Sequence, residues 1–320
     1  MGRLLITGGA GFIGSNLARQ ALGRGWLVRI IDNLSTGSES NFKSLQRLGA
    51  DVFLGDINDN ILLEKCLRDC DAVVHLAAQV SVPQSVIAPS ETMKINVDGT
   101  ANILNYSLQC GVKKVISASS AAVYGNASDL PLKEIDAGEL LSPYAESKWI
   151  NEDQILQSRK QGLESTALRF FNVFGQGQSP NGAYAAVIPK FVDMLIRNIP
   201  PTINGDGLQT RDFVHVDDVC AAIFLLLGEE NGKSKHHVYN IATQTQINLL
   251  ELIEIIKSSI KKLKPEFVDI KPKFTPDRVG DVRNSMGSIE RINSDLGWSP
   301  KTKFQVGIDK LVKERLDLEI

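Results

Sequence analysis

The sequence predicts an α/β protein built on a doubly wound parallel β-sheet, with a second and smaller mixed α/β part. Three observations lead to this prediction. Short apolar runs recur along the first half of the chain and alternate with segments of helical periodicity, which is the pattern of strand-helix-strand units in one parallel sheet. The first apolar run passes through glycines into a helical pattern. An acidic residue then closes the second apolar run.

The first expected strand, Leu4–Ile6, runs into Gly8, Gly11 and Gly14. Glycine adopts positive φ freely and lets the backbone approach a ligand closely. The start of the following helix offers unpaired N–H groups and the positive end of its dipole. The apolar face of that helix consists of Ile13, Leu17 and Ala21. The stretch therefore predicts a pyrophosphate site for a dinucleotide, and the alternative is an ordinary turn between a strand and a helix.

The second expected strand, Leu27–Ile31, ends at Asp32, which is placed to accept hydrogen bonds from an adenosine ribose. The polar segment Asn33–Gly37 lies where a loop would wrap the adenosine. No Arg or Lys adjoins Asp32, and strand alternation sends Arg29 to the face of Ile31. A 2′-phosphate would meet a carboxylate without a counter-charge, so we expect NAD rather than NADP.

The chain continues with three more expected strands, which are Asp51–Leu54, Ala72–Leu76 and Lys113–Ala118. A long helix is expected over about 89–110. Ala77 and Ala78 follow the fourth strand, where small side chains let a cofactor lie against the backbone. His75 is a candidate base, but a lone His in an apolar strand is more often a hydrogen-bonded interior residue.

Hydroxyl groups gather where the fifth strand ends, at Ser117, Ser119 and Ser120. A helix is expected to start at Ser142-Pro143, with Ser as the N-cap and Pro in the first turn. It carries Tyr144 and Lys148 four residues apart, and hence on one face. A phenol with a pKa near 10 is a poor base at neutral pH. The ammonium group, together with the positive charge of an oxidised nicotinamide, is expected to lower the pKa of Tyr144.

Composition excludes several classes of function. The 320 residues are 43% hydrophobic and 22% charged, and the formal net charge of −2 gives no reason to expect a nucleic-acid partner. The most basic stretch, Lys257–Lys264, is expected to be the solvated face of a helix. The apolar run Ala221–Leu227 is too short to span a bilayer.

The cysteines are scattered, at Cys66, Cys70, Cys110 and Cys220. Cys66 and Cys70 are expected to share a helix face, but no further Cys or His completes a metal set. The chain enters a strand directly, so we expect no signal peptide. These features predict reduced thiols, a cytoplasmic protein, no membrane association and no metal.

Several of these residues together resemble a known family. Thr7-Gly8-Gly9-Ala10-Gly11-Phe12-Ile13-Gly14, Asp32, Asp56, Ser120 and Tyr144-x-x-x-Lys148 are similar to the motifs of the extended short-chain dehydrogenase/reductase family. The resemblance covers essentially the whole chain and implies a Rossmann-type sheet. Among the members, the nucleotide-sugar 4-epimerases are the most similar. The related 4,6-dehydratases carry Thr-Asp-Glu where this chain has Ser120-Ala121-Ala122, which argues against dehydration.

The second half extends the resemblance. Phe170–Gly175 looks like the strand end that contacts nicotinamide and substrate phosphate, and Pro180–Phe191 resembles the uridine-binding segment of epimerases that act on UDP-N-acetylhexosamines. Asn204–Gly207 and Arg211–Val216 follow as in the family. Arg211 and Arg278 match its pyrophosphate-binding arginines, and guanidinium groups suit phosphate oxygens.

The resemblance implies a role for each matching residue. The catalytic residues would be Ser120, Tyr144 and Lys148. The residues that bind NAD would be Gly8, Gly11, Phe12, Ile13, Gly14, Asp32, Asn33, Ser35, Thr36, Gly37, Asp56, Ile57, Leu76, Ala77, Ala78, Gln79, Asn96, Tyr144, Lys148 and Phe171. The residues that bind the UDP-sugar would be Ser81, Ser120, Tyr144, Asn172, Ala186, Val187, Lys190, Asn204, Arg211, Arg278, Asp281 and Ser285.

Substrate size is expected to depend on Ser285. Epimerases restricted to UDP-glucose and UDP-galactose tend to carry a bulky Tyr at the matching position, and those that accept N-acetylated sugars carry a small residue. The sequence therefore favours UDP-GlcNAc and UDP-GalNAc, and a small residue also permits the plain hexoses. The alternative is that Ser285 is only a loop residue.

Two parts are expected. The NAD-binding part comprises residues 1–171, to which 215–242 return with a helix and a strand. Residues 172–214 and 243–320 would form the UDP-sugar-binding cap. By analogy with the family, we expect a homodimer.

The predicted activity is that of an NAD-dependent UDP-sugar 4-epimerase, an isomerase with tightly bound NAD. The resemblance implies that NAD takes a hydride from carbon 4, that Tyr144 takes the hydroxyl proton, that Ser120 hydrogen-bonds the same oxygen and that Lys148 binds the nicotinamide ribose. One alternative is a nucleotide-sugar reductase or dehydrogenase that exchanges its NAD(P). Another is a non-catalytic NAD-sensing regulator, which would not need the intact Ser, Tyr and Lys set.

Overall fold

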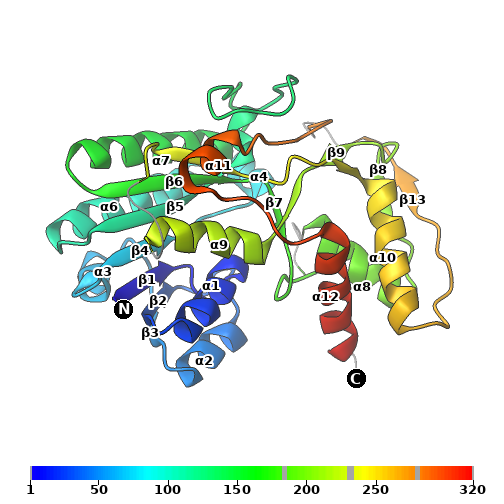
Figure 1. Ribbon diagram of the computed structural model, residues 1–320, viewed down its shortest axis with the longest axis horizontal. Coiled ribbons are helices and arrows are strands. Elements are labelled where there is room, and N and C mark those ends of the chain that lie inside the picture. Colours follow the sequence, from blue (N-terminus) through cyan, green and yellow to red (C-terminus); the bar gives the residue numbers. More distant parts are fainter. Residues whose placement is uncertain (1, 182–185, 229–233, 278–281, 319–320) are drawn as a thin grey trace.

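The centre of the computed structural model, which describes residues 2–181, 186–228, 234–277 and 282–318, is a seven-stranded parallel sheet with helices on both faces (Figure 1). Its strands, in order across the sheet, are β11 (Val238–Ile241), β6 (Glu164–Phe170), β5 (Lys114–Ser120), β4 (Ala72–His75), β1 (Arg3–Thr7), β2 (Leu27–Asp32) and β3 (Asp51–Leu54). The chain leaves β1 toward β3 on one side and returns to β4 on the other. This reversal opens the ligand crevice of doubly wound sheets at the carboxyl ends of β1 and β4. The predicted fold class is confirmed.

Strand alternation divides the core into two layers. Leu4 and Ile6 of β1 pack into one buried cluster, and Leu5 packs into the cluster on the opposite face. Helices that contribute to the first cluster are α1 (Phe12–Gly23), α2 (Glu39–Arg47), α9 (Val216–Leu227) and α11 (Glu290–Leu296). Helices that contribute to the second are α3 (Asn60–Leu67), α6 (Gly99–Gln109) and α7 (Pro143–Lys160).

A further buried cluster joins α8 (Val187–Ile196), α10 (Leu249–Leu263) and α12 (Phe304–Asp317), which stand together beyond the sheet (Figure 1). Short strand pairs accompany these helices, namely β7 (Asn172–Phe174) with β10 (Phe213–His215), β8 (Thr202–Asn204) with β13 (Lys273–Thr275), and β9 (Thr210–Arg211) with β12 (Ile247–Asn248). The remaining helices are α4 (Val82–Ile87), α5 (Pro89–Met93), the π-helix η1 (Lys94–Asp98) and the 3₁₀-helix η2 (Ala121–Tyr124). The division into an NAD-binding part and a cap stays a prediction.

Several expected elements differ in detail. The fourth strand ends at His75, and the fifth runs on to Ser120. The long helix over 89–110 contains the π-helix between α5 and α6. Cys70 lies beyond the end of α3, so the expectation that it shares a helix face with Cys66 was wrong.

The stretch from Lys257 was also judged wrongly in part. Lys257 is buried and forms ion pairs with Glu254 (2.8 Å) and Asp269 (2.7 Å). Lys261 and Lys262 are exposed, as expected for a solvated helix face. An ion pair with Asp269, which comes from the segment after the helix, could not be seen in the helical periodicity. Within the part of the chain that the structure describes, no helix is long and apolar enough to cross a membrane.

A buried ion pair fixes α7 to the sheet. Glu152 of α7 accepts two hydrogen bonds from Arg169 of β6, at 2.8 and 2.7 Å. Ser119 also donates to Glu152 (2.6 Å), and Arg169 donates to the phenol oxygen of Tyr124 (2.9 Å). Both charged side chains are almost fully buried. Removing one partner of such a pair leaves an uncompensated buried charge.

We expect Arg169→Met to lower the free energy of unfolding by about 3–5 kcal/mol, because it leaves the buried Glu152 carboxylate without a charged partner. The double variant Glu152→Met/Arg169→Met should lose clearly less, since neither charge remains. Urea unfolding of the two variants and the wild type measures the difference. A double variant as unstable as Arg169→Met would show that the loss of stability comes from packing and not from the unpaired charge of Glu152.

Candidate active site

The glycine-rich turn connects β1 to α1 as predicted. Gly8 has a positive φ of 66°, and its carbonyl oxygen accepts from the N–H of Gly11 (3.1 Å). A Cβ on Gly14 would lie 2.2 Å from that same oxygen, so only glycine fits there. Gly11 caps α1 without any side-chain hydrogen bond. The first-turn N–H groups of α1 therefore lack a side-chain acceptor, which suits an anion at this helix start.

Asp32 ends β2 beside this turn. One carboxylate oxygen accepts from the N–H of Ala10 (2.9 Å) and the other from the N–H of Leu34 (2.8 Å). Arg29 donates to the carbonyl of Cys66 (2.8 Å), on the opposite face of the strand. The carboxylate is thus held by backbone amides, with lone pairs left for a ligand.

The loop after Asp32 approaches the end of the neighbouring strand. Asn33 donates to the carboxylate of Asp56 (3.0 Å), and the N–H of Ser35 donates to the Asn33 side chain (3.0 Å). A Cβ on Gly37 would lie 2.6 Å from a carboxylate oxygen of Asp32. Predicted residues from β2, its loop and the end of β3 therefore lie together.

The end of β4 is packed equally tightly against the turn. A Cβ on Gly8 would lie 2.8 Å from the backbone nitrogen of Ala77. Gln79 exchanges two hydrogen bonds with Asn96, its N–H donating to Oδ1 (2.8 Å) and its carbonyl accepting from Nδ2 (3.0 Å). His75 is a buried residue with partners on both ring nitrogens, as expected for an interior role. Burial, aided by the charge of Lys148, lowers the pKa of His75 to about 3.

Ser120, Tyr144 and Lys148 come together at the carboxyl end of β5. Ser142 caps α7 by accepting from the N–H of Ala145 (3.1 Å), which fixes the first turn that carries Tyr144. Tyr144 forms a hydrogen bond with Ser120. Lys148 donates to the carbonyl of Ala118 (3.0 Å), and its Nζ lies 5.9 Å from the centre of the Tyr144 ring.

Burial shifts the pKa of both Tyr144 and Lys148. Burial raises the pKa of Tyr144, and the opposing hydrogen bond with Ser120 does not offset it. The predicted lowering of this pKa requires the positive charge of an oxidised nicotinamide as well as Lys148, so it stays a prediction. In the protein alone, the buried phenolate loses its hydration, which raises the pKa. Burial also lowers the pKa of Lys148 to about 8, against the attraction of Glu152.

Only one of the three serines is placed beside Tyr144. Ser117 is buried within the sheet, and Ser119 donates to Glu152. The sequence showed three hydroxyls at a strand end, but alternation along β5 sends Ser117 and Ser119 to one face of the sheet and Ser120 to the other. Ser120 is the one that reaches the phenol.

A cavity of about 560 Å³ lies between β7, α8 and the short strands. Six residues predicted to bind substrate line it, namely Asn172, Ala186, Val187, Lys190, Asn204 and Arg211. Val173 and Phe174 belong to the strand end expected to contact substrate phosphate, and Ile188 and Phe191 belong to the expected uridine-binding segment. The sequence did not indicate a binding role for the remaining lining residues, which are Val80, Gln178, Thr202, Gln209, Phe213 and Leu249. Two cations, four side-chain amides and several apolar side chains suit a ligand with both phosphate and ring components.

Among the described residues, four predicted substrate residues do not line this cavity, namely Ser81, Ser285 and the catalytic residues Ser120 and Tyr144. Ser81 caps α4 by accepting from the N–H of Gln84 (3.2 Å), next to the lining residue Val80. Ser285 is 9% exposed and donates its N–H to the carbonyl of Thr210 (3.2 Å). Arg278 and Asp281 lie outside the described residues, as do residues 182–185 of the proposed uridine segment.

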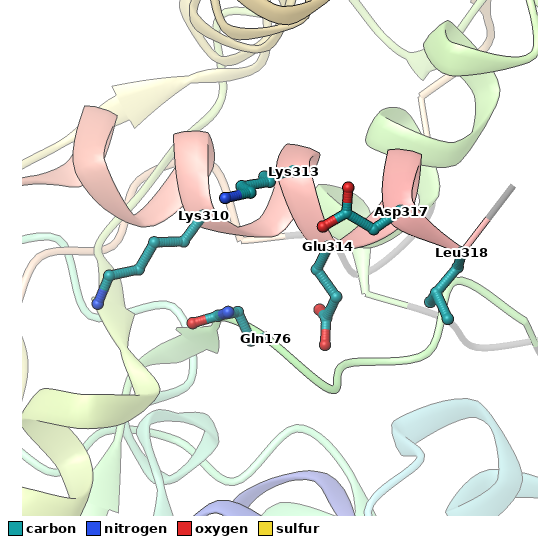
Figure 2. A pocket seen from close by; sticks show the side chains of 6 residues that line it. All are labelled: Gln176, Lys310, Lys313, Glu314, Asp317 and Leu318. Atoms are coloured by element: carbon teal, nitrogen blue, oxygen red, sulfur yellow. The ribbon is translucent and has the colours of Figure 1, made fainter. Parts of the chain in front are cut away.

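A second cavity, of about 490 Å³, lies between Gln176 and the end of α12. Figure 2 shows its lining side chains, which are Gln176, Lys310, Lys313, Glu314 and Asp317 together with Leu318 just beyond the helix. Its charges are mixed, and none of the predicted site residues lines it. Among the described residues, no group of three or more His, Cys, Asp or Glu side chains could hold a metal ion.

The chain is similar to known proteins over nearly its whole length. The model of the NAD dependent epimerase/dehydratase family matches residues 4–242. A putative UDP-glucose 4-epimerase from Methanocaldococcus jannaschii is 39% identical, with 97% of each chain covered. The structure of UDP-N-acetylglucosamine 4-epimerase from Methanobrevibacter ruminantium, in complex with UDP-N-acetylmuramic acid, superposes with a TM-score of 0.90 at 35% identity over 99% of each chain. A UDP-N-acetyl-α-D-glucosaminuronate decarboxylase from Bacillus cytotoxicus is 30% identical, with 99% of this chain and 98% of the relative covered.

We expect Gly14→Ala to open the glycine-rich turn, since its methyl group would clash with a backbone oxygen. Overpacking of this kind costs typically about 1–3 kcal/mol. The purified variant should also carry less bound dinucleotide than the wild type. Thermal unfolding and chromatography of the released nucleotide measure both effects.

Gly23→Ala is the matched control, because it lies in the same helix and no atom would come within 4 Å of the added methyl group. It should keep the dinucleotide and gain up to about 1 kcal/mol. Equal loss in both variants would mean that α1 tolerates no alanine for reasons unrelated to the turn.

Proposed function

The chain belongs to the NAD dependent epimerase/dehydratase family, and we propose that it is a UDP-sugar 4-epimerase with UDP-GlcNAc and UDP-GalNAc as its main substrates. The observation that carries the proposal is the assembly of Ser120, Tyr144 and Lys148 at the carboxyl end of β5. The full-length similarity to 4-epimerases supports the reaction class.

NAD is the cofactor of the family, and the residues present fit it. The glycine turn has no room for Cβ atoms at Gly8 and Gly14, and the bare helix start of α1 suits the pyrophosphate. Asp32 is held in place to bind the adenosine ribose. When bound, NAD supplies the hydride acceptor and a positive charge next to the phenol.

The protein's own residues would handle the proton. Tyr144 takes the proton of the hydroxyl on carbon 4, while Ser120 hydrogen-bonds the same oxygen and holds it against the phenol. Lys148 binds the nicotinamide ribose and stabilises the phenolate from one helical turn away. Because burial raises the pKa of Tyr144, this nearby positive charge is needed for the phenol to act as a base near neutral pH.

The cavity would hold the nucleotide and leave the sugar free to turn. Inversion requires that the sugar present both faces to the same three residues. An anchor on the pyrophosphate permits this rotation, and Lys190 and Arg211 supply cations for it. Arg278 is proposed as a second anchoring arginine.

The preference for N-acetylated sugars rests on the small side chain of Ser285. Its backbone is fixed to Thr210, beside the cavity residue Arg211, which supports a place near the substrate. The relatives differ in this respect, since one is described as acting on UDP-glucose and another on UDP-N-acetylglucosamine. A homodimer, formed as in the family, is part of the proposal.

Purified protein should interconvert UDP-GlcNAc and UDP-GalNAc without added cofactor, which separates an epimerase from a reductase or an NAD-sensing regulator. A panel with UDP-glucose and UDP-galactose ranks the substrates. UDP-N-acetylglucosaminuronate tests, through release of CO₂, the activity for which the Bacillus cytotoxicus relative is named.

Tyr144→Phe should lower the rate by about a hundredfold or more, because the proton acceptor is lost.

Tyr106→Phe is the control for the loss of a hydroxyl, since Tyr106 packs against the α3–α6–α7 side of the core. It should keep wild-type turnover. Strict dependence on free NAD(H), or near-native turnover by Tyr144→Phe, would contradict the mechanism.

The rate should also fall as pH rises above about 8, because Lys148, whose pKa is lowered to about 8, loses its positive charge there. Lys148→Arg keeps a charge at every accessible pH, so this fall should disappear even if the rate drops. Lys257→Arg alters a buried lysine of the α10 region and should leave the profile unchanged. If the rate of Lys148→Arg still falls above pH 8 as that of the wild type does, the fall comes from the titration of another group.

A further inference from the structure

A chain of buried hydrogen bonds begins at the glycine-rich turn. Thr7 Oγ1 accepts from the N–H of Ala77 (3.1 Å) and from that of Leu76 (3.2 Å), which it shares with the Thr7 carbonyl, so both of its lone pairs face backbone donors. Its own proton must therefore point to His75 Nδ1, which lies 2.8 Å away. Nδ1 of His75 is the acceptor, and the ring proton is on Nε2.

The chain continues from His75 into the helix region. Thr100 donates its hydroxyl proton to the carbonyl of Asn96 (2.7 Å), so it accepts from His75 Nε2, at 3.0 Å. Thr7, His75, Thr100 and Asn96 are each at most 4% exposed, so water does not compete for these bonds. Burial lowers the pKa of His75 to about 3, and the ring stays neutral in this single tautomer.

The last links reach the catalytic helix. Asn96, in the π-helix, donates through Nδ2 to Ser147 Oγ (2.9 Å), and Ser147 donates to the carbonyl of Tyr144 (2.8 Å). π-Helical turns interrupt the regular α-helical pattern and are frequent at functional sites. Each donor points from Thr7 toward Tyr144; at Asn96 the bond from Thr100 ends on the backbone carbonyl, and the next bond starts from the side-chain amide of the same residue.

We propose that His75 is a positioning residue, which joins the glycine-rich turn to the first turn of α7 and so holds Tyr144 in register with the bound dinucleotide. The inference rests on the proposed function, since Tyr144 is the group being positioned. His75 itself touches neither substrate nor cofactor in this role. It acts because both of its nitrogens are used, one as an acceptor and one as a donor.

The series of hydrogen bonds can be interrupted at two places without altering His75. Thr100→Val and Ser147→Ala each remove one hydroxyl and preserve most of the shape. Each should lower kcat roughly 10- to 100-fold, as small displacements of a catalytic group do, with the content of bound NAD unchanged. Because both substitutions interrupt the same series of hydrogen bonds, kcat of the double variant should be little lower than kcat of either single variant.

Ser107→Ala is the matched control. Ser107 is fully buried on the same helix as Thr100, and its hydroxyl has no hydrogen-bond partner within the described chain. It should leave kcat unchanged. If Thr100→Val and Ser147→Ala behave like Ser107→Ala, or if their effects on kcat multiply, the positioning role is wrong.

A second readout does not depend on turnover. The ¹⁵N resonances of His75 should show a protonated Nε2 and an unprotonated Nδ1, and amide exchange over residues 144–148 should be faster in Thr100→Val than in Ser107→Ala. The opposite tautomer, or equal exchange in the two variants, would overturn the inference. If the wild type fails to epimerise any UDP-sugar, the proposed function fails, and these two measurements still decide whether the chain exists and holds α7.

Discussion

The burial of Lys148 is the constraint on which the rest of the site depends. Its ammonium group lies almost out of water, and its Nζ is held by the carbonyl of Ala118 at the end of β5. Burial works against its charge, and Glu152 one turn further along α7 works in its favour. Glu152 would itself be too costly to bury without the two-point pairing from Arg169. The charge of Lys148 therefore depends on the buried ion pair between Glu152 of α7 and Arg169 of the sheet.

The parallel sheet explains why the parts of the site, which come from distant segments, lie together. Thr7, His75 and Ser117 are in register across β1, β4 and β5, so the carboxyl ends of the central strands lie at one edge. One end supplies the glycine turn, the next the packed segment around Ala77, and the third the serine beside Tyr144. The helices on one face then bring Tyr144 and Lys148 to that edge. The site is thus a consequence of strand order and of the caps that start each helix.

Local signals in the sequence predicted most of this arrangement. The glycines, Asp32, the Ser-Pro start of α7 and the four-residue spacing of Tyr144 and Lys148 each depend on a few neighbouring residues. What could not be predicted depends on contacts between distant segments. The commitment of Ser119 to Glu152, the burial of Lys257 and the raised pKa of Tyr144 all follow from packing. The cavity residues Gln178 and Gln209 were missed because no local pattern distinguishes them from loop amides.

In the proposed 4-epimerase, hydride leaves and returns to carbon 4 within one site, and isotope labelling follows this hydride. UDP-GlcNAc carrying deuterium on carbon 4 would be converted by the purified protein in unlabelled water, and the product analysed by NMR and mass spectrometry. We expect UDP-GalNAc to keep its deuterium on carbon 4, with none in the solvent or in free NADH. Loss of the label to water would mean inversion by proton abstraction from carbon, and its appearance in free NADH would mean an exchanging dehydrogenase; either result would contradict the proposed 4-epimerase mechanism.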